Sequence, residues 1–65
     1  MTEAELRKRL EQLRIEHRDL DAAIDALSAM DSPDQLQIAR LKKGKLQLRD
    51  GMAAIEDELI PDIIA

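Results

Sequence analysis

The sequence lacks cysteine and every aromatic residue, and it contains a single histidine, His17. Without cysteine the chain can form neither a disulfide bond nor a thiolate metal site. A zinc ion bound to one histidine would need carboxylates for its other ligands, so we expect no metal and no cofactor. The absence of Phe, Tyr and Trp removes the stacking platforms of most RNA and single-strand binders, and also the large anchors of enzyme pockets. We therefore expect no enzymatic activity and no small-molecule substrate.

Glycine, proline and long apolar runs are also scarce. The chain has two glycines and two prolines, and no apolar run long enough for a membrane span or a secretory signal. Its net charge of -4 suggests neither a membrane nor a nucleic-acid partner. A cytoplasmic location suits a chain without cysteine. At 65 residues we expect one domain, 1–65, which buries only about 60% of its unfolded surface, so a lone core is marginal.

Two segments carry a heptad pattern of apolar residues. Residues 3–30 contain no glycine or proline, and their seam steps by three and four through Leu6, Leu10, Leu13, His17, Leu20, Ile24 and Leu27. In the second segment the seam is Ile38, Leu41, Lys45, Leu48, Met52, Ile55 and Leu59. Both segments are therefore predicted to be amphipathic helices.

The short stretch between the two segments predicts a tight turn. Ser32 is expected to be the N-cap of the second helix, with Pro33 at the first helical position and Gln35 completing a capping box. We expect helices at about 3–30 and 33–60, a turn at about 31–33, and a short apolar tail at 61–65. The prediction is an all-α fold: an antiparallel two-helix hairpin of coiled-coil type that associates into a helical bundle.

The charges beside the seam favour one register, in which partner positions sum to about 65. Leu13 then faces Met52, and Leu20 faces Lys45. The expected charge pairs are Arg7 with Glu56, Arg9 with Glu58, and Asp21 with Lys42, and the one unfavourable pair is Arg14 with Arg49.

Two glycines lie seven residues apart on one edge of the second helix. Gly44 and Gly51 each cost about 1 kcal/mol relative to alanine in a helix. They indicate either a close approach of the helices, opposite Ala23 and Glu16, or drift at an exposed edge. The sequence leaves both alternatives open.

The seam contains two polar residues, His17 and Lys45. A single polar residue in a heptad seam often fixes register and oligomeric state, and we favour this specificity role for both. Lys45 can lay its methylenes over Leu20 and direct its ammonium toward Asp21. A pH switch at His17 and a catalytic base at either residue are the alternatives.

A basic run and a second apolar stripe are candidate binding surfaces. The run Arg40, Lys42, Lys43, Lys45 and Arg49 could bind phosphate, but leucines interleave at seam spacing, so a solvated helix face is the favoured interpretation. Off the seam, apolar residues form a candidate interaction surface for a second copy or another helical protein: Ile15, Leu36, Ala39, Leu46, Ala53 and Ile60.

The motifs "EHRDLD" at residues 16–21 and "LKKGKLQLRD" at residues 41–50 resemble the YdcH-like family of small bacterial proteins. The resemblance spans roughly residues 10–55 and departs at Gly44 and Gly51. It implies a coiled-coil-like helical hairpin in the bacterial cytoplasm, and it implies no activity, because the family has none assigned. We expect a small non-enzymatic interaction module that acts by self-association or by docking to a partner helix. The alternative is a nucleic-acid-associated protein that uses the basic run at 40–49.

Overall fold

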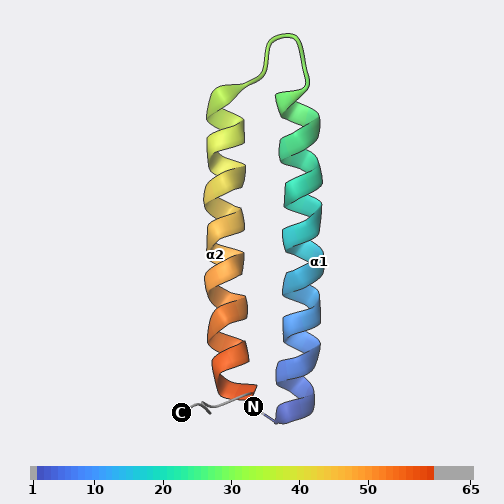
Figure 1. Ribbon diagram of the computed structural model, residues 1–65, viewed down its shortest axis with the longest axis vertical. Helices are drawn as coiled ribbons and strands as arrows, with labels where there is room; N and C mark the ends of the chain where they lie inside the picture. Colours follow the sequence, from blue (N-terminus) through green and yellow to red (C-terminus); the bar gives the residue numbers. More distant parts are fainter. Residues whose placement is uncertain (1, 60–65) are drawn as a thin grey trace.

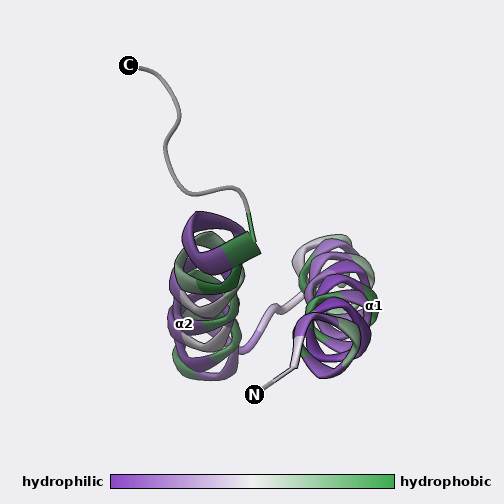
Figure 2. Ribbon diagram, turned by 90° about the horizontal axis from the view of Figure 1, so that it is seen from below, coloured by the Kyte–Doolittle hydropathy of each residue, from purple (hydrophilic) through white to green (hydrophobic). Residues whose placement is uncertain are grey.

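The computed structural model describes residues 2–59, which form two antiparallel helices (Figure 1). Helix α1 spans Glu3–Ser28 and helix α2 spans Gln35–Leu59. They lie side by side in one layer (Figure 2), with extents of 47 × 23 × 14 Å. The prediction of an all-α helical hairpin is confirmed. Ile60 and the tail at 61–65 lie outside the described residues.

Helix α1 begins at a capping box. The Thr2 hydroxyl accepts a hydrogen bond from the Glu5 backbone N–H at 3.2 Å, and the Glu5 carboxylate accepts one from the Thr2 N–H at 2.9 Å. Two of the free amide groups at the helix start are thereby satisfied. At the other end, the Ala29 N–H donates to the Asp25 carbonyl at 3.1 Å. The helix ends at Ser28, two residues earlier than we expected from the sequence.

The prediction for the start of helix α2 is wrong: Asp34, and not Ser32, is the N-cap. The Asp34 carboxylate accepts a hydrogen bond from the Gln37 N–H at 3.0 Å, and its carbonyl accepts one from the Ile38 N–H at 3.0 Å. Aspartate and serine are equally good caps, and a carboxylate also interacts favourably with the positive end of the helix dipole. The connection between the helices therefore covers residues 29–34, with Pro33 outside the helix.

The predicted seam forms the core. Every seam residue is buried or half-buried, and the five buried ones are Leu6, Leu10, Leu13, Ile24 and Ile38, each 4–8% exposed. The two polar members, His17 and Lys45, are half-buried. Among residues 2–59 no large side chain is fully buried, so the core is a single thin line of contacts between two helices.

The glycines of helix α2 confirm the expected register to within about one residue and correct their predicted neighbours. A Cβ placed on Gly44 would lie 3.6 Å from Leu20 Cδ1, and one on Gly51 would lie 3.4 Å from Leu13 Cδ1. The glycines thus face leucines of the seam, and not Ala23 and Glu16 as predicted. Both distances are ordinary van der Waals contacts, so the helices do not approach so closely that only glycine fits.

Candidate interaction surface

A groove runs between the helices beside the middle of the seam, and we call it the central groove. It has a volume of about 400 Å³. Helix α2 lines it with Lys42, Lys45, Leu46 and Arg49, and helix α1 lines it with His17, Asp21, Ile24 and Asp25. The groove therefore has a cationic wall on one helix and an acidic wall on the other, with Ile24 and Leu46 as its apolar lining.

Lys45 and Asp21 form an ion pair across this groove, as the sequence predicted for Lys45. The Lys45 ammonium donates a hydrogen bond to the Asp21 carboxylate, and this bond is the main reason why the pKa of Asp21 is lowered. Partial burial opposes the shift, while the positive charge of Lys45 and, more weakly, of His17 adds to it. The pair joins α1 to α2 at the half-buried position of Lys45. The predicted pairing of Asp21 with Lys42 is wrong, because Lys45 is the partner.

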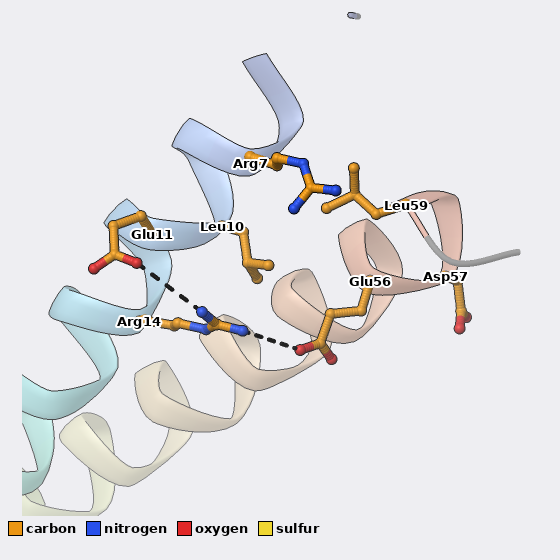
Figure 3. A pocket seen from close by; sticks show the side chains of 7 residues that line it. All are labelled: Arg7, Leu10, Glu11, Arg14, Glu56, Asp57 and Leu59. Carbon is orange, nitrogen blue, oxygen red and sulfur yellow. Dashed lines mark ion pairs between the residues drawn. The ribbon is translucent and has the colours of Figure 1, made fainter. Parts of the chain in front are cut away.

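A second hollow, of about 570 Å³, lies at the open end of the hairpin (Figure 3). Arg14 lies across it and approaches Glu56 of helix α2 at 3.7 Å and Glu11 of its own helix at 4.0 Å. Arg7 instead pairs with Glu3 at 2.7 Å. The predicted pair of Arg7 with Glu56 is therefore wrong. Glu56 pairs with Arg14 instead.

The predicted interaction residues of the described chain are exposed, and Leu46 and Ile15 line different hollows. Leu36, Leu46 and Ile15 are 63%, 56% and 50% exposed, and Ala39 and Ala53 are also exposed. Leu46 lines the central groove, whereas Ile15 lines a hollow formed by helix α1 alone, with Glu11, Arg14 and Arg18. Ile15 follows Leu13 by two residues, about 200° around the helix, and so lies on the outer side of α1. The sixth predicted residue, Ile60, is outside the described part of the chain.

One exposed apolar side chain was missed by the sequence reasoning. Met30, in the connection between the helices, is 56% exposed. The sequence placed it at the end of the first helix, where the heptad pattern gives it no seam position. Its place outside the seam was the one sequence signal for a surface position, and the structure adds that helix α1 ends at Ser28, before Met30.

The basic run is divided between surfaces. Lys42, Lys45 and Arg49 line the central groove, where Asp21 and Asp25 face them. Arg40 and Lys43 do not line it. The five cations therefore do not present one uninterrupted basic face, and Lys45 is already paired.

Two further kinds of site are absent from residues 2–59. No group of three His, Asp or Glu side chains is arranged to hold a metal ion. Neither of the two described helices is long and apolar enough to cross a membrane.

One family model matches residues 10–56 of this hairpin, and its description is "Protein of unknown function (DUF465)". The match covers more than half of the chain. The chain belongs to the DUF465 family. The YdcH-like proteins that the motifs resemble are members of the same family, so the resemblance is confirmed. No curated protein and no solved structure matches the chain. The DUF465 match begins at Leu10 and ends at Glu56, and it therefore includes the whole central groove.

Proposed function

We propose that this protein is a small, non-enzymatic interaction module that acts by self-association or by docking to a helix of another protein. The observation that supports the proposal is a one-layer hairpin whose outward apolar side chains Ile15, Leu36 and Leu46 are at least half exposed. The proposal includes a cytoplasmic location, as expected from the sequence. The nucleic-acid alternative stays a prediction, and the divided basic run gives it no support.

The elongated, one-layer shape of the hairpin supports packing against a further layer of helices. Its Cα radius of gyration is 15.0 Å, whereas a compact domain of this length has about 11 Å. Globular domains usually pack two layers around one core, and this one is 14 Å thick. Further hairpins laid on the first would bury the apolar residues that a single layer leaves in contact with water.

The gain from such burial is large for a chain of this size. Fully burying a leucine or isoleucine side chain contributes about 1.5–3 kcal/mol, so burying the exposed half of one contributes roughly 1 kcal/mol. Three such residues would contribute roughly 3 kcal/mol, which is comparable with the total that a lone core of this length supplies.

The test is the molar mass in solution, measured by light scattering and sedimentation over a range of micromolar concentrations. We expect the wild type to have a molar mass above that of the monomer. The double variant Leu36→Glu and Leu46→Glu should have the molar mass of the monomer. The double variant Gln37→Glu and Gln47→Glu is the matched control, because it adds the same two charges at exposed positions of the same helix.

The docking alternative needs its own comparison. Affinity capture from the native cell is performed with the wild-type chain and with the double variant Leu36→Glu and Leu46→Glu. Only proteins that the wild type captures and this double variant does not are taken as partners. A strict monomer that captures no such protein would remove the proposal.

A further inference from the structure

Two apolar surfaces of the hairpin differ in both shape and charge. One is the central groove with Leu46, and the other is the outer side of helix α1 with Ile15. We infer that the central groove binds the outer side of helix α1 from a second copy of this chain. The inference rests on the proposed self-association and specifies its interface: copies join through two different surfaces, each copy offering both.

The two surfaces are complementary in side-chain size. Along helix α2, Ala39, Leu46 and Ala53 are seven residues apart, which places a large residue between two small ones on one side of the helix. The outer side of helix α1 carries Ile15 and, seven residues later, Ala22. When Leu46 of one copy packs against Ala22 of the other, Ile15 lies two helical turns from that contact. It then faces Ala39 or Ala53 of helix α2, depending on whether the two helices run parallel or antiparallel. Large residues then meet small ones at both contacts.

The surfaces are also complementary in charge. Residues 40–49 of helix α2 hold five basic side chains and no acidic one, and Lys42 and Arg49 flank Leu46 in the groove. Within residues 2–59 neither Lys42 nor Arg49 forms an ion pair, and Asp21 is paired with Lys45. A partner surface in the groove would therefore meet two unpaired cations and the one carboxylate of Asp25.

The outer side of helix α1 supplies acidic groups of a similar spacing. Residues 19–28 contain three aspartates and no cation. Asp19 and Asp25 lie three residues to either side of Ala22, and Asp25 is on the edge that this side of the helix shares with the central groove. Arg18 lies beside Ile15, so the acidic part is the half nearer the turn. Along the helix axes, the two aspartates are about 9 Å apart and Lys42 and Arg49 about 10 Å apart.

A symmetric dimer of groove against groove is the competing arrangement, because the cations of one groove would also meet the carboxylates of the other. It predicts that Ile15→Glu associates as the wild type does, because Ile15 lies outside the groove. Contact between two different surfaces instead extends into longer arrays or closes into a ring, and does not stop at a dimer by itself.

The test mixes two variants that each damage one surface. Leu46→Glu places a carboxylate in the groove and leaves the outer side of α1 intact, while Ile15→Glu damages that outer side and leaves the groove intact. Both positions are at least half exposed, and circular dichroism checks that both variants keep their helices. Gln47→Glu and Gln12→Glu are the matched controls on the two helices.

We expect each variant alone to be monomeric, and an equimolar mixture to form a dimer of one copy of each, because only one intact interface is available per pair. We also expect the double variant Lys42→Glu and Arg49→Glu to weaken wild-type association at least tenfold. Three outcomes would overturn this interface while the proposed function stands. The wild type associates but the mixture stays monomeric, either single variant associates as the wild type does, or the charge variant associates as strongly as the wild type. A wild type that is monomeric at every concentration overturns both self-association and this interface.

Discussion

Replacing Gly44 by alanine should stabilise the hairpin. Glycine in a helix interior is about 1 kcal/mol less favourable than alanine, and position 44 lies within helix α2. The new Cβ would meet Leu20 Cδ1 at 3.6 Å, an ordinary contact, so no strain opposes this gain. Because Gly44 is half-buried, burial of part of one methyl group adds a few tenths of a kcal/mol. We expect a total of about 1.0–1.4 kcal/mol.

The measurement is thermal unfolding followed by far-ultraviolet circular dichroism. For a chain of this length 1 kcal/mol corresponds to a shift of about 4–8 °C, so Tm should rise by roughly 5–10 °C. The protein concentration is held fixed, because association makes Tm depend on it. Gln47→Ala, at an exposed site where both residues favour a helix, should change Tm by far less.

A comparison within the same helix sharpens the prediction. At Gly51 the added Cβ would lie 3.4 Å from Leu13 Cδ1, which is closer, so Gly51→Ala should stabilise by the same amount or less. A Gly44→Ala protein with unchanged or lower Tm would refute the reasoning. It would mean that the helices pack more closely at this position than the 3.6 Å contact shows, and that glycine is sterically required there.

Three further experiments test separate features of the hairpin. Asp34→Ala should cost about 1 kcal/mol in the free energy of unfolding, whereas Ser32→Ala should cost little, and urea titration of both variants checks which residue caps helix α2. Since the pKa of Asp21 is lowered in the folded state, its contribution to stability is present above its unfolded pKa and lost as pH falls through the folded value. Tm measured across the acidic range should fall more steeply for the wild type than for Asp21→Asn, and identical slopes would contradict the importance of the pair with Lys45. His17→Leu should raise Tm, because an apolar residue completes the seam, and any loss of stability would show that the half-buried histidine is required for packing.

The heptad spacing was sufficient to predict the hairpin and its seam. Both helices, and the at least partial burial of all seam positions, follow from residues that recur by threes and fours. The antiparallel order follows from the short connection and the flanking charges. The ion pair of Lys45 with Asp21 was also predictable, because the cation sits at a seam position and its methylenes can reach a neighbouring carboxylate.

The details that failed depend on choices between residues of similar propensity. Asp34 and Ser32 are both good caps, and only the geometry of the turn selects one of them. Arg7 had two acidic groups within reach and took Glu3 on its own helix. Exposed ion pairs of this kind differ by less than 1 kcal/mol, so sequence alone cannot rank them. The position of Leu46 beside the central groove likewise required the relative rotation of the helices.

The distribution of burial connects the stability of the hairpin with its surface. The buried side chains fall into two groups, Leu6, Leu10 and Leu13 toward the open end and Ile24 and Ile38 toward the turn. Between them the seam contains His17 and Lys45, and its apolar members are only half-buried. The central groove lies beside this weakly packed middle, with Leu46 exposed on it. A helix bound there would cover the part of the seam that the chain packs least well, and its binding free energy would add directly to the stability of the folded hairpin. Polar residues in the seam therefore make the lone hairpin weak at the same place where the surface is best suited to a partner.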